Sequence, residues 1–229
     1  MYFQFVENMN KKQINQNNIG YACLTVGVSS FNYKNLNLKS FNVENFNKVV
    51  NHNLDVLINM LDYYIKNNIN MFRISSSIIP LASHKINNID WNNEKFKIIR
   101  EKIINNNIRV SMHPGQYTVL NSNNEEVVKA SIKELEYHAK FLDLISEDSD
   151  LILHVGGVYG DKTSAIERFI NNYKLLSNNI KNKLVIENDD KSYNVEDVLY
   201  INSILNIPVV FDNLHNILNP SNLTEEECL

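Results

Sequence analysis

Six short runs of aliphatic and β-branched residues recur along the chain, separated by longer segments in which apolar and polar residues alternate at helical spacing. The runs cover residues 19–28, 71–74, 108–112, 151–155, 184–186 and 208–211. Apolar runs of this length and composition are typical of buried β-strands. We therefore predict six buried strands.

Three of the intervening segments show apolar stripes with the period of an α-helix. The stripes are Val50, Leu54, Leu57, Leu61 and Tyr64, then Val128, Ile132, Leu135, Ala139 and Leu142, then Ile166, Phe169, Ile170 and Tyr173. Asn194, followed three residues later by Asp197, predicts the start of a further helix. Alternation of apolar strands with helices indicates an α/β fold with a parallel sheet.

The positions of the polar residues decide between a doubly wound sheet and a barrel. No glycine fingerprint opens the first helix, so a dinucleotide-binding fold has no support. Four of the six predicted strands end in a residue able to bind a metal, namely His113, His154, Glu187 and Asp212, and His215 follows shortly after. In a (β/α) barrel such strand ends surround one mouth. We therefore predict a TIM-type barrel with a metal centre at that mouth.

Imidazole and carboxylate ligands together suit zinc, manganese or iron, and a central carboxylate such as Glu187 could bridge two ions. One histidine or aspartate at a strand end is more often structural than a ligand. Agreement among four independent strand ends favours the metal site.

Composition bounds the protein class. With 229 residues and 44% hydrophobic content, the chain can bury one sizeable core. We expect an Asn- and Lys-rich N-terminal extension over residues 1–18 and a barrel domain over residues 19–229. The two cysteines, Cys23 and Cys228, have neither disulfide-framework nor zinc spacing, which favours a reducing cytoplasm. No run suggests a signal peptide or a membrane span.

The net charge of −4 argues against a generally basic nucleic-acid surface. A local basic groove or bound divalent cations can supply positive potential without changing that sum.

Five ordered motifs make the interpretation more specific. They are MFRISSS (71–77), RVSMHPGQY (109–117), HVGGVYGDK (154–162), LVIEND (184–189) and FDNLH (211–215). Together they resemble the UV-damage endonuclease family, a relative of the endonuclease IV and xylose isomerase barrels. The resemblance implies a DNA-repair enzyme that cuts the backbone 5′ to UV photoproducts and other distorting lesions. It also implies two or three divalent ions, usually Mn²⁺, with Zn²⁺ as an alternative.

The resemblance also implies roles for single residues. The implied metal ligands are His113, His154, Glu187, Asp212 and His215. The implied lesion-contacting residues are Gln116, Tyr117 and Tyr21, and without the motif the first two would be ordinary loop residues. The implied catalytic residues are Glu187, His84 and Lys162. Lys162 could reach a phosphate or lie in a solvated loop.

Three further expectations concern the whole protein. A barrel of this class has eight strands and only six are found, so we expect a C-terminally incomplete barrel with exposed edges. The expected partner is damaged double-stranded DNA, and no membrane partner is expected. We expect the complete protein to be a cytoplasmic monomer that acts at the nucleoid. Two alternatives stay open: a sugar isomerase or epimerase of the same superfamily, and an inactive damage-binding remnant.

Overall fold

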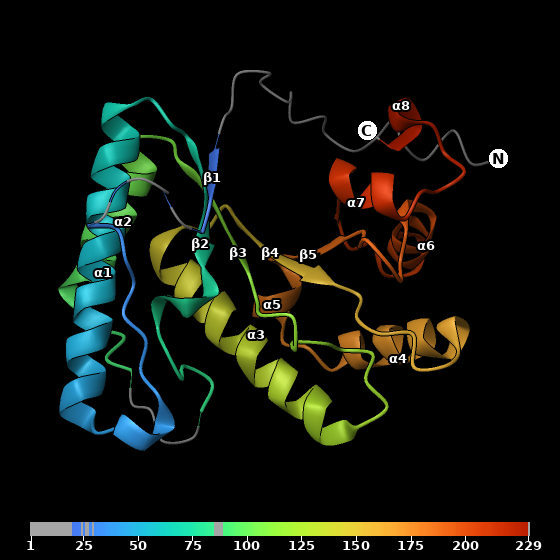
Figure 1. Ribbon diagram of the computed structural model, residues 1–229, viewed down its shortest axis with the longest axis horizontal. Coiled ribbons are helices and arrows are strands. Elements are labelled where there is room, and N and C mark those ends of the chain that lie inside the picture. Colours follow the sequence, from blue (N-terminus) through green and yellow to red (C-terminus); the bar gives the residue numbers. More distant parts are fainter. Residues whose placement is uncertain (1–19, 24, 26–27, 29, 85–88, 229) are drawn as a thin grey trace.

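The computed structural model describes residues 20–228 apart from residues 24, 26–27, 29 and 85–88 (Figure 1). Its six strands form one parallel sheet in which each strand pairs with the next in chain order. The strands are β1 (Gly20–Ala22), β2 (Met71–Ser75), β3 (Arg109–His113), β4 (Ser149–His154), β5 (Leu184–Glu187) and β6 (Val209–Val210). Sequential parallel order with helical crossovers is the winding of a (β/α) barrel.

Helices connect the strands and cover the outside of the sheet (Figure 1). They are α1 (Val43–Lys66), α2 (Glu94–Asn105), α3 (Glu125–Ile145), α4 (Lys162–Lys174), α5 (Asn178–Lys181), α6 (Val195–Leu205), α7 (Asn213–Leu218) and α8 (Glu225–Cys228), with 3₁₀ turns η2 (Leu38–Ser40) and η3 (Ser76–Ile78). Packing of α1 on α2, and of α2 on α3, forms a continuous outer layer. The predicted fold class, a TIM-type barrel with six of its eight strands present, is confirmed.

The predicted helical stripes contribute to the core between the helices and the sheet. All five stripe residues of α1 are buried, with Leu54, Leu57, Leu61 and Tyr64 at 0% exposure. In α3 and α4 most stripe residues are buried as well, while Ile132, Ile170 and Tyr173 are half-buried. Asn194 begins α6 as predicted, because its side chain and that of Asp197 form a reciprocal capping box.

The sequence did not single out α2. Asn93 caps this helix, but only three of its twelve residues are buried, namely Phe96, Ile99 and Ile103. Three buried residues form too short an apolar stripe for the helix to be predicted from the sequence.

The predicted first and last strands were too long, and the prediction that they are buried was wrong. Instead of residues 19–28, β1 contains only Gly20–Ala22, because the chain bends at Cys23, whose φ is 62°. Instead of residues 208–211, β6 contains only Val209–Val210, and both are half-buried. Both strands lie at the edges of the described sheet and pair on one side only, so less of their surface is covered.

The predicted N-terminal extension, residues 1–18, lies outside the described residues. None of the helices in the described part of the chain combines the length and apolar character needed to cross a bilayer.

Candidate metal centre

Parallel pairing places the strand ends side by side. Ser75 of β2 pairs with His113 of β3, and His154 of β4 pairs with Glu187 of β5. Three predicted ligands therefore come from adjacent strands at one edge of the sheet. Glu187 is the most buried of the three, with a side chain only 3% exposed.

The three side chains converge on one point. His113 Nε2 and His154 Nε2 each lie 3.4 Å from Glu187 Oε2. One ligand atom from each of the three residues can be chosen so that all lie within 4.8 Å of one another. Around a tetrahedral ion with bonds of about 2.1 Å, neighbouring ligand atoms are about 3.4 Å apart. The spacing and the ligand types therefore fit a divalent metal ion, and we call these three residues the metal group.

Hydrogen bonds orient two imidazoles in this region. His113 Nδ1 lies 2.8 Å from the carbonyl oxygen of Pro114, and His215 Nδ1 lies 2.8 Å from that of Asn188. Since a carbonyl only accepts, each Nδ1 carries the proton and donates it. Nε2 is thereby the atom that each ring offers to a metal ion when the ring is neutral, and when His113 is protonated its Nε2 can donate to Glu187 instead.

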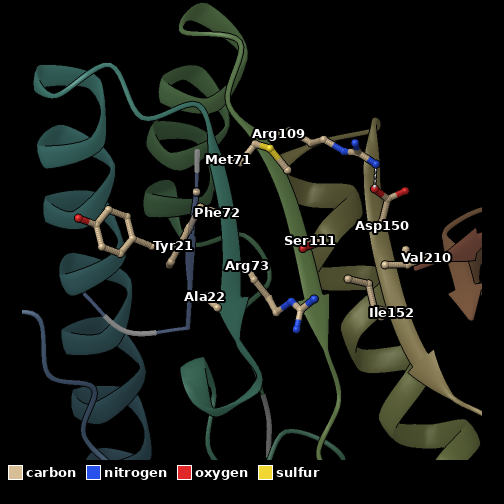
Figure 2. Close-up of a pocket in the computed structure, with 11 residues that line it drawn as sticks. Tyr21, Ala22, Met71, Phe72, Arg73, Arg109, Ser111, Asp150, Ile152 and Val210 are labelled. Carbon is tan, nitrogen blue, oxygen red and sulfur yellow. Dashed lines mark hydrogen bonds and ion pairs between the residues drawn. The ribbon is translucent and has the colours of Figure 1, made fainter. Parts of the chain in front are cut away.

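A guanidinium approaches the other oxygen of Glu187. Arg73 Nη2 lies 3.7 Å from Glu187 Oε1. Arg73 also lines a cavity of about 430 Å³, together with Ala22, Ser111 and Ile152 from three other strands. Figure 2 shows Arg73 extending from β2 toward β3 on this face, which is the inner face of the barrel. Glu187 thus has two imidazoles on one oxygen and a cation near the other.

Burial and charge act in opposite directions on Glu187. Burial alone would raise the pKa of its carboxyl group, but the His113 hydrogen bond and the charges of His154 and Arg73 hold the pKa below its ordinary value. Burial lowers the pKa of His154, and nearby His113 lowers it further. The lowered pKa values favour the ionised carboxylate of Glu187 and, once the pH exceeds the lowered pKa of His154, its neutral imidazole, which are the forms that bind metals.

Asp212 and His215 lie beside the metal group without being part of it. The rings of His154 and His215 are 5.4 Å apart. Asp212 Oδ1 accepts a hydrogen bond from the backbone N–H of His215 and so caps α7, and its Oδ2 lies 3.7 Å from His215 Nδ1. The structure therefore places both residues near the predicted centre, with the Asp212 carboxylate engaged at a helix start.

Two predicted lesion-contacting residues lie in the loop after β3. Gln116 lines a groove of about 430 Å³ whose walls include His113 and His154. Tyr117 is 83% exposed. Tyr21 behaves differently, because its ring stacks on Tyr64 of α1 at 5.5 Å and points toward that helix in Figure 2.

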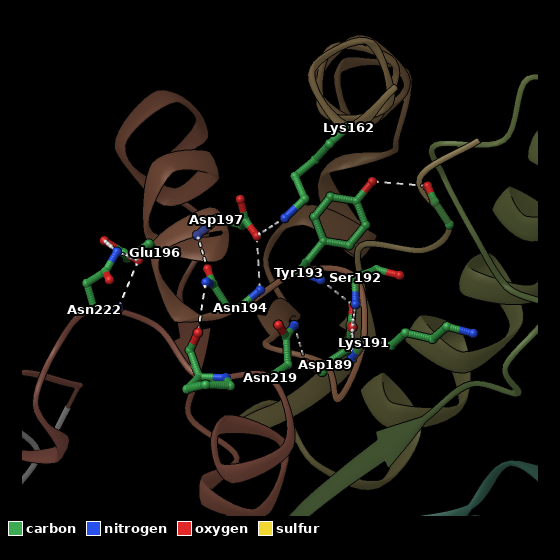
Figure 3. Close-up of polar contacts among 12 residues, drawn as sticks. Lys162, Asp189, Lys191, Ser192, Tyr193, Asn194, Glu196, Asp197, Asn219 and Asn222 are labelled. Atoms are coloured by element: carbon green, nitrogen blue, oxygen red, sulfur yellow. Dashed lines mark hydrogen bonds and ion pairs between the residues drawn. The ribbon is translucent and has the colours of Figure 1, made fainter. Parts of the chain in front are cut away.

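The structure does not bring Lys162 to the metal group. Lys162 Nζ lies 2.7 Å from Asp197 Oδ2 and 5.6 Å from the centre of the Tyr193 ring, as Figure 3 shows. His84 is exposed, in a turn where its backbone N–H bonds to Leu81, directly before residues that the structure does not describe.

Three residues of this region were missed in the sequence. Arg73 is a charged residue within an apolar strand, a signal that could have been noticed. Asn188 directly follows Glu187 and bonds to Asp212. Asn121 belongs to an asparagine-rich connection that suggested a tolerant loop, yet it is fully buried and donates to the Gly157 carbonyl at 2.7 Å.

Known proteins share both the sequence and the fold. The model of the family described as UV-endonuclease UvdE matches residues 9–228. A UV DNA damage endonuclease from Clostridium perfringens is 51% identical over 204 residues, covering 87% of this chain and 50% of the relative. One from Bacillus cereus (strain B4264) is 39% identical over 186 residues, covering 79% of this chain and 59% of the relative. The chain thus spans about half the length of the curated relatives it matches.

Solved structures agree with this relationship. The crystal structure of SacUVDE has a TM-score of 0.87 and 41% identity, covering 92% of this chain and 74% of that one. Endonuclease IV from Thermus thermophilus shares the fold alone. Its TM-score is 0.52 at 14% identity, covering 69% of this chain and 58% of that one. The chain therefore belongs to the UV-endonuclease UvdE family.

Proposed function

We propose that this chain carries the catalytic mouth of a metal-dependent DNA-repair endonuclease that cuts the backbone 5′ to UV photoproducts and other distorting lesions. The observation that carries the proposal is the convergence of His113, His154 and Glu187 at the barrel mouth. Membership of the UvdE family supports DNA as the substrate.

The proposed cofactors are two or three divalent ions, Mn²⁺ in the first place and Zn²⁺ as the alternative. A divalent ion supplies Lewis-acid stabilisation for the negative charge that develops on a phosphate during hydrolysis. In this proposal His113 and His154 would hold one ion, Glu187 would serve this ion and a neighbouring one, Asp212 would bind that neighbour, and His215 would bind a third ion.

The β3–α3 loop is proposed to recognise the lesion. Photoproducts weaken stacking, so a protein that opens the duplex there meets a lower deformation cost than at undamaged pairs. The 83% exposure of Tyr117 supports this role, because a free ring can replace a displaced base. Gln116 shares its groove with two metal-group residues, and its amide can replace lost base-pair hydrogen bonds.

We also propose that Tyr21 contacts the lesion and that His84 and Lys162 take part in catalysis. Because the Tyr21 ring stacks on Tyr64 of α1, it would have to leave that packing to contact a lesion. Lys162 would have to leave Asp197 to reach a phosphate. We also propose a cytoplasmic monomer that acts at the nucleoid on double-stranded DNA.

The sugar-enzyme alternative shares only its fold with this chain. D-psicose 3-epimerase shares the fold, with a TM-score of 0.51 at 14% identity over 72% of this chain and 61% of that one. That identity carries no argument about activity, and the exposed Gln116–Tyr117 loop favours a large substrate over a small sugar.

The test uses UV-irradiated and untreated supercoiled plasmid with the protein in the full length that its gene encodes. We expect nicking of the irradiated plasmid only, dependent on manganese and stopped by a chelator. Equal nicking of both plasmids would contradict damage recognition. Epimerisation of a ketose without nicking would establish the sugar-enzyme alternative, and neither activity would favour the inactive remnant.

A further inference from the structure

The loop between β4 and α4 carries a tyrosine in an unusual conformation, close to the metal group. Tyr159 follows His154 by five residues, is 44% exposed and has a φ of 54°. Its neighbours Gly156 and Gly160 also have positive φ values, 115° and 91°. A bulky residue with this backbone geometry is uncommon and persists where its surroundings fix it, often at binding sites.

Two contacts fix the Tyr159 ring. A Cβ atom on Gly157 would lie only 3.1 Å from the ring atom Cε2, so the ring packs directly against the backbone of that glycine. The guanidinium carbon of Arg168 lies 5.6 Å from the ring centre. Arg168 Nε in turn donates to the Asn121 carbonyl at 2.8 Å. The ring is therefore held in place before any ligand arrives.

The loops around this ring are tied together as well. Asn121 Nδ2 donates to the Gly157 carbonyl at 2.7 Å and lies 3.0 Å from Tyr193 Oη. Tyr193 Oη also donates to the Gly157 carbonyl at 3.0 Å. Loops after β3, β4 and β5 are thus joined, which gives the Tyr159 ring a rigid support.

Tyr159 borders the groove that contains His113, His154 and Gln116. Its volume of about 430 Å³ is within the range, roughly 300–1,000 Å³, that takes small organic groups. Lys191 lies on another wall, and Figure 3 shows its side chain pointing away from the hydrogen-bonded cluster around Asp197. The groove thus has an aromatic surface, a cation and two metal-group histidines, and it also carries the carboxylates of Asp189 and Asp190. The ring suits a base, and Lys191 with ions bound at the metal group would supply positive charge for its phosphates.

We propose that Tyr159 is a base-stacking residue: one DNA base lies in this groove on its ring, beside the phosphate bound at the metal group, and Lys191 faces a neighbouring phosphate. This inference deepens the proposed nuclease function and rests on it. It is distinct from the role of Tyr117, which lines a different depression together with Val127 and Ala130, whereas Gln116 borders the same groove as Tyr159.

Tyr159→Asn is the main test variant, because asparagine tolerates a positive φ and lacks the ring. Tyr159→Gly serves as a second variant without strain. Tyr159→Phe keeps the ring and should behave like wild type. Tyr200→Ala removes another exposed tyrosine, on α6, and is the matched control. Thermal unfolding and manganese content are measured for every variant and should stay at wild-type values.

The probe is a duplex with one thymine dimer and 2-aminopurine next to it, bound by the protein in the full length that its gene encodes. Stacking on tyrosine quenches 2-aminopurine. We expect the Asn and Gly variants to bind about 5- to 100-fold more weakly, as loss of one base–aromatic stack predicts, and to give brighter complexes. The Phe variant and Tyr200→Ala should differ from wild type by less than about twofold.

Three results would overturn the inference. Wild-type quenching and affinity in Tyr159→Asn, with incision intact, would remove the stacking role and leave the nuclease function standing. An equal loss in Tyr159→Phe would mean that the hydroxyl matters and the ring does not. If wild type bound neither damaged nor undamaged duplex, the proposed function itself would fail, and the stacking role with it.

Discussion

Asn188 and Asp212 hold each other by two hydrogen bonds across the end of the sheet. Asn188 Nδ2 donates to the Asp212 carbonyl at 3.0 Å, and Asn188 Oδ1 accepts from the Asp212 N–H at 2.8 Å. The Asn188 carbonyl also accepts from His215 Nδ1. Asn188, which directly follows Glu187, therefore holds in place Asp212 and His215, the two proposed ligands beside the metal group.

We expect Asn188→Ala to weaken binding of manganese by about 10- to 100-fold, since partners that orient metal ligands typically contribute that factor. The reason is that the Asp212 backbone loses both contacts with the Asn188 side chain. Isothermal titration with Mn²⁺ measures the effect. Asn202→Ala, which removes a hydrogen bond from α6 to the Ile207 carbonyl, is the control and should bind normally. Unchanged affinity in Asn188→Ala would show that Asp212 and His215 do not serve the metal.

The double variant Gln116→Ala with Tyr117→Ala should lose lesion recognition and keep its metal. Tyr117 is 83% exposed, so its removal leaves no cavity in the core. We expect incision at photoproducts to fall by about 5- to 100-fold, since loss of one base stack costs on the order of 1–3 kcal/mol. Incision assays and metal analysis are run on the same preparations. Loss of metal would mean that the loop supports the centre instead of touching DNA.

His138 should make stability depend on pH. This residue of α3 is fully buried, with Nδ1 2.8 Å from the Glu134 carbonyl, and burial lowers its pKa below the ordinary value. The unfolded chain, with a histidine pKa of about 6.5, then binds the proton more readily than the folded chain. Stability is therefore full above about pH 6.5 and decreases as the pH falls below it, by up to about 1.4 kcal/mol per pH unit.

Urea unfolding at pH 7.5 and 5.5, in chelator, measures this loss. His154 also has a lowered pKa and contributes with the same sign, so His138→Gln is needed to separate the two. The variant should lose less stability than wild type over this range. An equal loss in both proteins would remove His138 as a cause.

The sequence predicted those parts of the fold and site that depend on the local pattern of apolar and polar residues. The apolar period of α1 was sufficient because every stripe residue lies on the buried face of that helix. The ends of β3, β4 and β5 were predictable because strand ends of a barrel converge wherever the connecting helices lie. His113, His154 and Glu187 therefore came together as expected.

The features that the sequence did not predict depend on contacts between residues far apart in the chain. Burial of β1 and β6 depends on neighbouring strands and not on their own composition. Lys162 meets Asp197, which lies 35 positions further along the chain, so its direction could not be read from the local motif. Asn121 is one of many asparagines, and only the fold shows that it joins three loops.

The most direct test of whether this metal centre cuts DNA is an incision assay. It compares wild type with the double variant His113→Ala, His154→Ala on a duplex with one defined photoproduct, over a range of manganese concentrations. Both substitutions remove a ligand that lies 3.4 Å from Glu187 Oε2. We predict that wild-type incision rises with manganese and stops in chelator, and that the double variant is at least about 100-fold slower at every concentration, consistent with loss of metal stabilisation worth several kcal/mol. Incision that persists in chelator, or at the wild-type rate in the double variant, would contradict a catalytic role for the metal group.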